Sequence, residues 1–334
     1  MRVLVTGATG FTGGHLARWL AARGDRVRVL VRPRSGSDAA RSVTHPGGDA
    51  PQFEVVSGDL TDADAVKKAT AGVDVVYHIA AIYRQAGLRE EQYRAVNATA
   101  VRTIIQAAKA GGAQRVVHCS TVGVHGDVER PPANEDAPLG PGDIYQETKL
   151  EGENIARAAA RETGMEVVIA RPTGIYGPGD RRLLKLFRGV ARRRFIILGT
   201  GEIFYHLTYI DDLVAGLHLC ATVPAAAGRT YILAGGEVTT LTRLAELIAE
   251  EAHVPPPSMH LPVWPFWFAG AICEVLCRPL RVEPLIYRRR VDFFTKSRAF
   301  DISRARTELG YAPAVGLREG IRRTLDWYRR QGWL

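Results

Sequence analysis

The sequence contains few cysteines and no long apolar run. Its four cysteines form no C-x-x-C pair, and Cys273 and Cys277 lie four residues apart, a spacing typical of packing on one helix face. Few unpatterned cysteines fit a reducing compartment, so we expect a cytoplasmic protein with no disulfide and no metal site. No stretch reaches roughly 18 uninterrupted apolar residues. The nearest, residues 261–277, contains two prolines and an acid. No signal peptide is recognisable after Met1.

The chain has 334 residues, 46% of them hydrophobic and 24% charged, which is the composition of an ordinary globular protein. At roughly 150 residues per domain, this length predicts about two domains, or one large α/β unit with a smaller attachment. The net charge of +9 is uneven, because basic residues cluster between Arg278 and Arg306. No nucleic-acid-binding motif accompanies that cluster, so we expect no nucleic-acid partner and favour a small anionic substrate or a membrane surface.

Short runs rich in valine and isoleucine alternate with amphipathic helical patterns as far as Arg171. Near-continuous apolar strands between helices are typical of a parallel sheet covered on both faces. We therefore predict an α/β fold, a Rossmann-type doubly wound parallel sheet with a smaller C-terminal substrate-binding region. The sheet domain should span residues 1–175, completed by parts of 205–235, and residues 176–334 should form mainly the substrate-binding region. The predicted strands are Arg2–Val5, Val27–Val31, Phe53–Val56, Val73–Ile79, Arg115–Cys119 and Glu166–Ala170.

Three glycines with G-x-x-G-x-x-G spacing follow the first predicted strand and precede an amphipathic helix. Glycines permit the tight turn and a close backbone approach to a pyrophosphate, and the helix N-terminus offers N–H groups to the phosphates. Such glycines can also form an ordinary loop, but the strand–turn–helix context favours binding of a nicotinamide dinucleotide. The predicted contacts are Gly7, Thr9, Gly10, Phe11, Thr12 and Gly13.

The second predicted strand ends in Arg32 and has no acid where one usually binds the adenosine ribose of NAD. An arginine there can pair with the 2′-phosphate of NADP, so NADP(H) is favoured over NAD(H) as the cofactor. The alternative is that Arg32 only stacks on adenine. Asp59, after the third strand, is predicted to hydrogen-bond the adenine amino group or, alternatively, to cap the helix that begins near Asp62.

Tyr145 and Lys149 form a Y-x-x-x-K pair, which on a helix places both side chains on one face. A neighbouring cation lowers the pKa of a phenol from about 10 and makes the group useful for proton transfer at neutral pH. The pair alone is common on solvated helices. Ser120 and Thr121 strengthen the catalytic interpretation, because they end a strand upstream, where a hydroxyl can face the phenol.

Together these segments resemble the extended short-chain dehydrogenases/reductases. That group includes nucleotide-sugar epimerases and dehydratases, dihydroflavonol reductases and 3β-hydroxysteroid dehydrogenases. The matching motifs occur in the expected order along nearly the whole chain. They are T-G-x-x-G-F-x-G at Thr6–Gly13, G-D-L at Gly58–Leu60, H-I-A-A at His78–Ala81, Asn97, S-T-x-x-V-H-G at Ser120–Gly126, Tyr145-x-x-x-Lys149, R-P-T-G-I-Y-G-P-G at Arg171–Gly179, Y-I-D-D-L at Tyr209–Leu213 and E-L-G-Y at Glu308–Tyr311.

The resemblance implies a catalytic set of Thr121, Tyr145 and Lys149. Tyr145 would move a proton to or from a substrate oxygen, and Lys149 would lower its pKa and hold the nicotinamide ribose. Thr121 would hydrogen-bond the reacting oxygen, with Ser120 as the alternative. Tyr83 is a further predicted substrate contact. Asn97 would order the active-site backbone, and the other implied cofactor contacts are Leu60, Ala80, Ala81, Pro172 and Thr173.

The chain departs from the family pattern at three places. Thr12 stands where a branched aliphatic residue is usual, which we interpret as a minor packing change. His125 replaces the usual tyrosine of a V-Y-G motif. Tyr205 occupies the position where nucleotide-sugar enzymes commonly carry an arginine that clamps the diphosphate. A tyrosine supplies one hydrogen bond and no charge, so a nucleotide sugar would need another cation, such as Arg181, Arg182 or Arg290.

Two hypotheses for the function stay open. The first is an NAD(P)-dependent epimerase or dehydratase acting at a secondary alcohol or ketone of a nucleotide sugar or sugar-like substrate, slightly favoured because such enzymes are numerous. The alternative is an NADP(H)-dependent reductase or dehydrogenase of the 3β-hydroxysteroid or dihydroflavonol type, which Arg32 and Tyr205 support. Retention of the cofactor through purification would favour the first. A catalytically inactive sensor fits less well, because Thr121, Tyr145 and Lys149 are all present.

Two further partners are expected. The resemblance implies a homodimer, formed through the helix that carries Tyr145 and the helix that follows Asn97. Residues 261–290 place Trp264, Trp267 and neighbouring aromatics before several arginines. They are predicted to cap the substrate pocket or, alternatively, to make peripheral contact with an anionic membrane.

Overall fold

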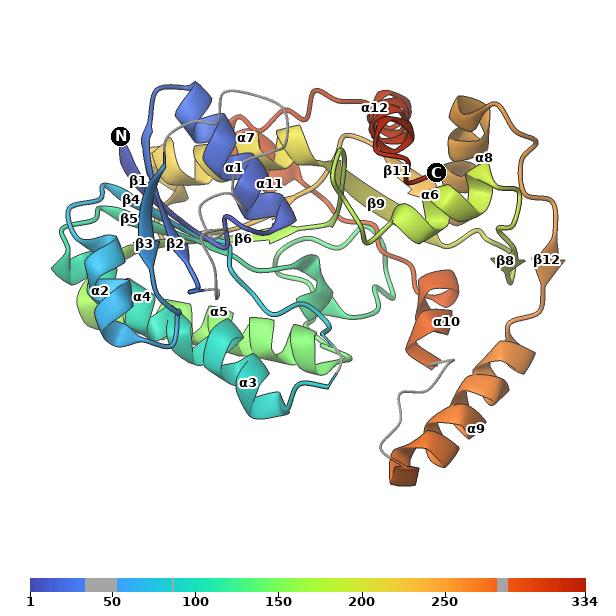
Figure 1. Ribbon diagram of the computed structural model, residues 1–334, viewed down its shortest axis with the longest axis horizontal. Coiled ribbons are helices and arrows are strands. Elements are labelled where there is room, and N and C mark those ends of the chain that lie inside the picture. Colours follow the sequence, from blue (N-terminus) through green and yellow to red (C-terminus); the bar gives the residue numbers. More distant parts are fainter. Residues whose placement is uncertain (34–52, 86, 281–287) are drawn as a thin grey trace.

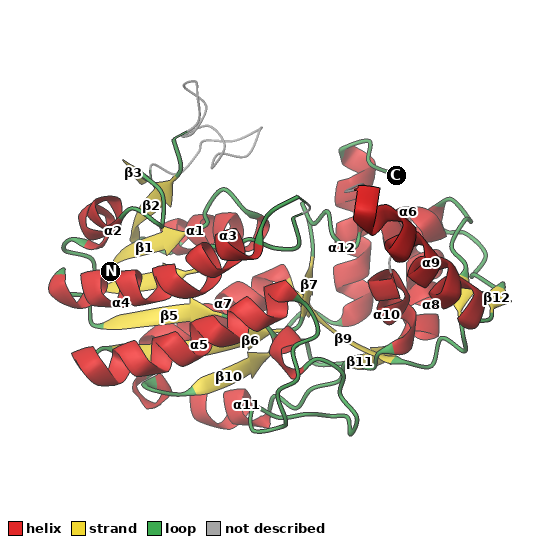
Figure 2. Cartoon of the chain, turned by 90° about the horizontal axis from the view of Figure 1, so that it is seen from below, coloured by secondary structure: helices red, strands yellow, loops and turns green. Residues whose placement is uncertain are grey.

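A computed structural model describes residues 1–33, 53–85, 87–280 and 288–334, with the side chains of all these residues except 274–280 and 288–290. Its largest unit is a seven-stranded parallel sheet in the order β10-β6-β5-β4-β1-β2-β3 (Figures 1 and 2). The predicted doubly wound parallel sheet is thus confirmed. The strands are β1 (Arg2–Thr6), β2 (Arg26–Val31), β3 (Glu54–Ser57), β4 (Val75–His78), β5 (Arg115–Cys119), β6 (Glu166–Pro172) and β10 (Thr230–Leu233).

Helices cover both faces of this sheet. Successive side chains of a strand contribute to two apolar cores, one on each face. In β1, Val3 and Val5 belong to the apolar cluster that contains Leu16 and Leu20, whereas Leu4 belongs to the cluster on the other face. This follows from strand geometry, in which successive side chains point to opposite faces. The first face carries α1 (Phe11–Ala22) and α7 (Ile210–Thr222), and the second carries α2 (Ala63–Thr70), α4 (Ala100–Ala110) and α5 (Ile144–Thr163).

The strand order reverses between β1 and β4. From β1 the chain runs outward to β2 and β3, and then returns to β4 before continuing to β5 and β6. Open α/β sheets bind ligands in the crevice at such a switch point, beyond the carboxyl ends of the strands. Thr6 of β1 connects the two strands at this point. Its Oγ1 accepts hydrogen bonds from the backbone N–H groups of Ile79 and Ala80, which follow β4, both at 3.2 Å.

The N-terminus of α2 tests one of the two roles predicted for Asp59, the capping of this helix. The Asp62 side chain accepts from the backbone N–H groups of Asp64 and Ala65 at 3.0 and 3.3 Å, so Asp62 is the N-cap of this helix. Asp59 Oδ1 instead accepts from the backbone N–H and the hydroxyl of Thr61 at 2.9 and 2.7 Å. The alternative that Asp59 caps the helix is therefore wrong.

The C-terminal end is built around smaller sheets. It contains a three-stranded sheet in the order β11-β9-β7, the strand pair β12–β8, and helices α6, α8 and α12, with α8 packing against both of the others. Helix α9 extends away from the body and packs against α10 (Figure 1). The elements are β7 (Gly174–Tyr176), α6 (Leu184–Ala191), β8 (Ile197–Leu198), β9 (Phe204–Tyr209), β11 (Val238–Thr240), α8 (Leu241–Ala252), β12 (His260–Leu261), α9 (Trp264–Leu280), α10 (Arg288–Thr295) and α12 (Leu317–Arg330). Helix α11 (Ser303–Leu309) instead packs against β10 of the large sheet.

Both α7 and β10 come from the segment 205–235 that the sequence assigns to the sheet domain, although the domain boundaries themselves stay a prediction. Of the helices that the structure describes, none combines the length and apolar character needed to cross a membrane.

Candidate active site

A cavity of about 910 Å³ lies where the carboxyl ends of the strands meet the C-terminal elements. Its volume falls in the upper part of the range for small-molecule sites. The structure brings nearly all of the predicted site residues to its wall. From the cofactor set these are Gly7, Thr9, Gly10, Phe11, Thr12, Gly13, Arg32, Asp59, Leu60, Ala80, Ala81, Tyr145, Pro172 and Thr173, and from the substrate set Tyr83, Ser120, Thr121 and Tyr205. Asn97 and Lys149 lie behind this wall, and the side chain of Arg290 is outside the described residues.

Two glycines of the turn lie where the surrounding backbone leaves no space for a side chain. Gly7 has φ +74°, and a Cβ there would lie 2.8 Å from the N and Cα atoms of Ala80. A Cβ at Gly13 would lie 2.3 Å from the carbonyl oxygen of Gly7. Helix α1 begins after Gly10 with no side-chain cap, so its first N–H groups can bind an anion. This cradle fits the pyrophosphate of a nicotinamide dinucleotide.

Arg32 and Asp59 line the part of the cavity that lies beyond β2 and β3. The pKa of Asp59 lies below its usual value. Burial alone would raise that pKa, but the hydrogen bonds from Thr61 and the charge of Arg32 lower it. The residues after Pro33 that continue this loop, including Arg34, are outside the described residues.

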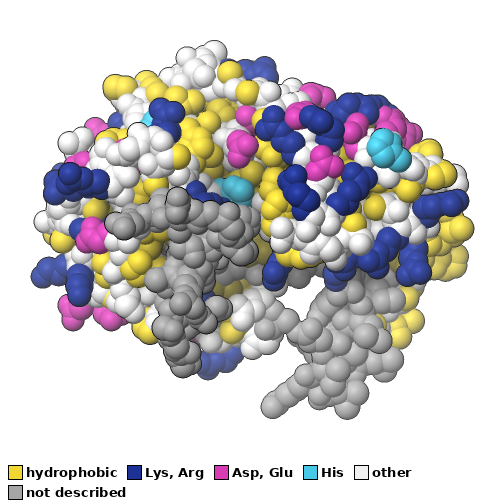
Figure 3. All heavy atoms as spheres, turned by 45° about the horizontal axis from the view of Figure 1, so that its top comes forward, with side chains coloured by type: hydrophobic (Ala, Val, Ile, Leu, Met, Phe, Trp, Pro, Cys, Tyr) yellow, Lys and Arg dark blue, Asp and Glu magenta, His cyan; other side chains and the backbone are white. Residues whose placement is uncertain are grey.

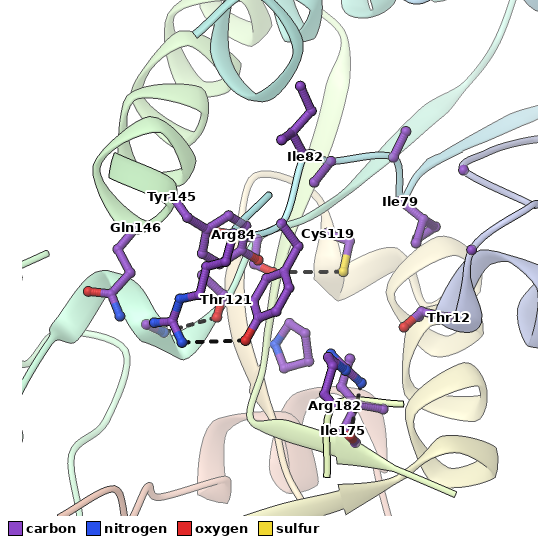
Figure 4. A pocket seen from close by; sticks show the side chains of 18 of the residues that line it. Thr12, Ile79, Ile82, Arg84, Cys119, Thr121, Tyr145, Gln146, Ile175 and Arg182 are labelled. Atoms are coloured by element: carbon purple, nitrogen blue, oxygen red, sulfur yellow. Dashed lines mark hydrogen bonds between the residues drawn. The ribbon is translucent and has the colours of Figure 1, made fainter. Parts of the chain in front are cut away.

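Tyr145 and Thr121 face the cavity from two different elements, the first turn of α5 and the end of β5. Figure 4 shows them close together, with Thr12 on the opposite side of the cavity. The hydroxyl of Thr121 accepts from the backbone N–H of Gly123 at 3.0 Å, which fixes its orientation. Burial is the largest cause of a raised pKa at Tyr145, followed by the neighbouring Cys119 and Tyr83. The charges of Arg182 and Arg84 act in the opposite direction and lower that pKa.

Lys149 is buried one helical turn after Tyr145. Its Nζ donates to the backbone oxygen of Cys119 at 2.7 Å, and Cys119 itself lines the cavity. Burial lowers the pKa of the ammonium, while Cys119 and Glu153 raise it. The charges of two arginines thus act to lower the pKa of Tyr145, and the same effect of Lys149 stays a prediction.

Arg84 is a cavity residue that the sequence analysis missed. It adopts φ +34°, which is uncommon for a residue with a side chain. Its Nη2 lies 2.8 Å from the carboxylate of Asp143, the N-cap of α5, so it ties its own loop to the first turn of the helix that carries Tyr145. The Tyr83 ring meets the Tyr145 ring edge-on with centroids 4.9 Å apart. No local pattern in the sequence indicates a left-handed arginine.

Asn97 orders the same loop from behind. Its Oδ1 accepts from the backbone N–H of Ile82 at 2.8 Å, and its Nδ2 donates to the carbonyl of Ile82 and to Thr148 Oγ1, both at 3.1 Å. It lies in a π-helical turn, Ala95–Thr99, a conformation frequent at functional sites.

A buried ion pair positions α5 against the sheet. Arg171, at the end of β6, donates to both carboxylate oxygens of Glu153, at 2.9 and 2.7 Å, and both residues are fully buried. Burial alone would raise the pKa of Glu153, but the hydrogen bonds and charge of Arg171 hold it below its usual value. His125 Nε2 lies 3.1 Å from Arg171 Nη1 and His125 Nδ1 lies 3.2 Å from the carbonyl of Pro138. His125 therefore belongs to this structural cluster.

Tyr205 lies in β9 at the substrate end of the cavity. It is buried, and its hydroxyl donates to the backbone oxygen of Phe293 in α10. Of the cations suggested as replacements for a diphosphate clamp, Arg182 lines the cavity, whereas the guanidinium of Arg181 lies 5.0 Å above the Trp333 ring. Lys296 and Arg298, which the sequence analysis did not single out, also line the cavity wall.

Comparison with known proteins now decides the family. The family model for the NAD dependent epimerase/dehydratase family matches residues 3–234. The chain belongs to this family of enzymes. The predicted membership of the extended short-chain dehydrogenases/reductases is confirmed.

Three relatives illustrate the range of the family. The chain is 29% identical over 351 residues to 3beta-hydroxysteroid-dehydrogenase/decarboxylase isoform 2 of Arabidopsis thaliana, and the match covers 97% of the chain but only 61% of the plant protein. It is 31% identical over 352 residues to a 3 beta-hydroxysteroid dehydrogenase/Delta 5→4-isomerase of Mycobacterium tuberculosis, covering 98% and 90%. A solved dTDP-glucose 4,6-dehydratase of Streptomyces venezuelae, with NAD and TYD bound, has TM-score 0.78 and 28% identity, covering 100% and 98%.

Proposed function

We propose that the protein is an NAD(P)-dependent dehydrogenase or reductase that interconverts a secondary alcohol and a ketone on an apolar, steroid-like substrate. The observation that carries this choice is Tyr205, an uncharged, buried residue at the position of a diphosphate-clamping arginine, with its hydroxyl already bonded to Phe293. Leu207 and Phe300 extend the apolar wall beside it. The names of the Arabidopsis and Mycobacterium relatives support the same substrate class.

In this proposal Tyr145 exchanges a proton with the substrate oxygen, and the hydroxyl of Thr121 holds that oxygen in place. When bound, the nicotinamide supplies the hydride donor or acceptor. Lys149 would turn from the carbonyl of Cys119 to the nicotinamide ribose. Arg182 and Arg84 would stabilise the phenolate, since their charges lower the pKa of Tyr145.

Arg32 supports NADP(H) over NAD(H) as the cofactor, because it lines the adenosine end of the cavity and the strand before it ends without an acid. The cytoplasmic location, the homodimer through α4 and α5, and the division at residue 175 also stay part of this proposal. They rest on the sequence and on the family resemblance.

A nucleotide-sugar epimerase or dehydratase is the second candidate. The observation that favours it is the presence of Lys296 and Arg298 in the cavity wall beside Tyr205, where they could pair with phosphates. A cofactor that stays bound through purification, with binding of nucleoside diphosphates and none of steroids, would support this candidate over the first.

Replacement of Tyr145 tests the proposed chemistry. We expect Tyr145→Phe to lower kcat by about 10²- to 10⁴-fold with the best substrate from a panel of 3-hydroxysteroids, ketosteroids and nucleotide sugars, because only the proton transfer is removed. Cofactor affinity, measured by fluorescence titration, should stay unchanged. Tyr231→Phe, whose hydroxyl donates to Glu308 away from the cavity, is the matched control. Wild-type turnover in Tyr145→Phe at saturating substrate would contradict the assignment.

A further inference from the structure

Large apolar side chains are exposed at one edge of the C-terminal end. Trp264, Phe268 and Ile272 of α9 are 66%, 55% and 59% exposed, and their spacing of four residues places them on one face of the helix. Such side chains are normally buried, so three of them in one row indicate an interaction surface. We name this surface the α9 edge and include in it the exposed residues Ile196, Met259, Trp264, Trp267, Phe268 and Ile272.

The strand pair β8–β12 brings together the two segments of the chain that contribute to the α9 edge. The backbone N–H of Ile197 donates to the carbonyl of Met259 at 3.1 Å, which places Ile196 beside Met259. The two strands run parallel, and α9 begins directly after β12. Among the described residues, the α9 edge holds half of the large hydrophobic side chains that are exposed.

The charge around the α9 edge is mainly positive, and the acids that border these segments in the sequence are Glu202 and Glu274. Residues 255–273 contain no charged side chain, and residues 181–201 contain basic residues but no acid. Arg192, Arg193 and Arg194 are exposed immediately before Ile196. Figure 3 shows Lys and Arg side chains gathered along the border of the body at this end of the molecule. The apolar surface is therefore flanked by positive charge.

We propose that the α9 edge docks the protein on an anionic membrane surface. Tryptophan and phenylalanine enter the boundary between headgroups and acyl chains, and arginines beside them bind anionic headgroups. This chemistry fits lipid better than a second copy of the chain, because two copies of this basic edge would repel each other. Helix α9 would lie in the plane of the interface.

The docked edge lies next to the cavity. Helix α9 packs against α10, and Phe293 and Asp292 of α10 line the cavity wall. Docking would thus hold one wall of the site near the lipid, where an apolar substrate is most concentrated. The docking itself goes beyond the proposed function and does not depend on it.

Co-sedimentation of the full chain with vesicles tests the proposal, in the absence of cofactor and substrate. We expect binding to vesicles of equal parts phosphatidylglycerol and phosphatidylcholine, weakened by added salt, and little binding to phosphatidylcholine alone. Phe268→Glu should weaken binding at least tenfold. Val55→Glu, which places the same charge at a 42% exposed apolar position on β3, should bind as the wild type does. Arg192→Gln with Arg194→Gln should weaken binding by about tenfold or more.

Three outcomes would overturn the proposal. The first is no binding to anionic vesicles at low salt by a protein whose thermal unfolding is normal. The second is equal binding to neutral and anionic vesicles, which would remove the role of the arginines. The third is self-association in solution that Phe268→Glu abolishes, without vesicle binding, which would assign the edge to a second copy of the chain. Because no turnover is measured, none of these outcomes depends on the substrate class.

Discussion

The two ends of the molecule differ in how their residues are held in place. At the cofactor end, parallel strands buried on both faces deliver Gly7, Ala80 and Thr121 to one edge of a single sheet. At the substrate end, Tyr205 lies in a three-stranded sheet, and α10 approaches it from a distant part of the sequence. A site built at the ends of neighbouring parallel strands is thus defined by local sequence, whereas a site built between elements far apart in the sequence depends on tertiary contacts.

The buried ion pair of the cofactor end provides the strongest test of this difference. We expect Arg171→Met to lower the free energy of unfolding by about 3–5 kcal/mol, because Glu153 would stay buried without its main partner. Arg322→Met on α12 removes an arginine that also pairs with a glutamate, but 57% of its side chain is exposed. Its cost should be about 0–1 kcal/mol. Equal losses of unfolding free energy in the two variants, measured by urea denaturation, would remove the distinction between the two ends.

Arg32 tests whether the cofactor end also selects its ligand. We expect Arg32→Asp to weaken NADP(H) binding about 10- to 100-fold more than NAD(H) binding, because a charge-assisted pair becomes a repulsion. Fluorescence titration of both cofactors measures the difference. Arg26→Asp makes the same change at the opposite end of β2 and should affect both cofactors little. Equal weakening of both cofactors by Arg32→Asp would show that Arg32 only stacks on adenine.

Two histidines buried in the sheet make the stability of the cofactor end depend on pH. His78 and His118 lie with ring centroids 5.3 Å apart, and both are fully buried. Burial, assisted by the charge of Lys149, lowers the pKa of His78 to about 3 and lowers that of His118 well below its usual value. In the unfolded chain both histidines bind a proton below about pH 6.5, whereas in the folded protein they stay neutral. Their stabilisation is therefore complete above about pH 6.5 and is lost as the pH falls towards 3.

The variant His118→Leu measures this effect. The free energy of unfolding of the wild type should fall by up to about 1.4 kcal/mol per pH unit for each histidine below about pH 6, and His118→Leu should remove one such contribution. His260→Leu, at an exposed histidine of the substrate end, is the control variant. An unaltered slope in His118→Leu would mean that this histidine is protonated in the folded protein.

The smallest effect is expected at α9. Trp264→Ala should change the free energy of unfolding by no more than about 0.5 kcal/mol, because most of the side chain is already exposed. Phe187→Ala in α6, fully buried within the same end, should cost about 3–5 kcal/mol. A large loss of unfolding free energy in Trp264→Ala would show that α9, like α6, is part of the folded core.

The same contrast explains what the sequence could and could not predict. The strand runs and the glycine turn follow local rules, so the sheet, the cradle at Gly7–Gly13 and the meeting of Tyr145 with Thr121 were all predictable. Arg84 has a left-handed backbone and is bonded to Asp143, which lies 59 residues away, and no local pattern indicates either feature. The partner of Tyr205 is also remote, since Phe293 lies 88 residues further along the chain.

The last strand of the sheet has a consequence for how the chain matures. Strand β10 pairs with β6 but is formed from Thr230–Leu233. Strand β6 is therefore the outermost strand on its side of the sheet until those residues have left the ribosome. Until then the edge of β6 presents unpaired backbone groups that another chain could join. During synthesis at about 5–20 residues per second, this interval lasts a few seconds. A fragment that ends near residue 175 would keep that edge permanently, and its main hazard would be aggregation.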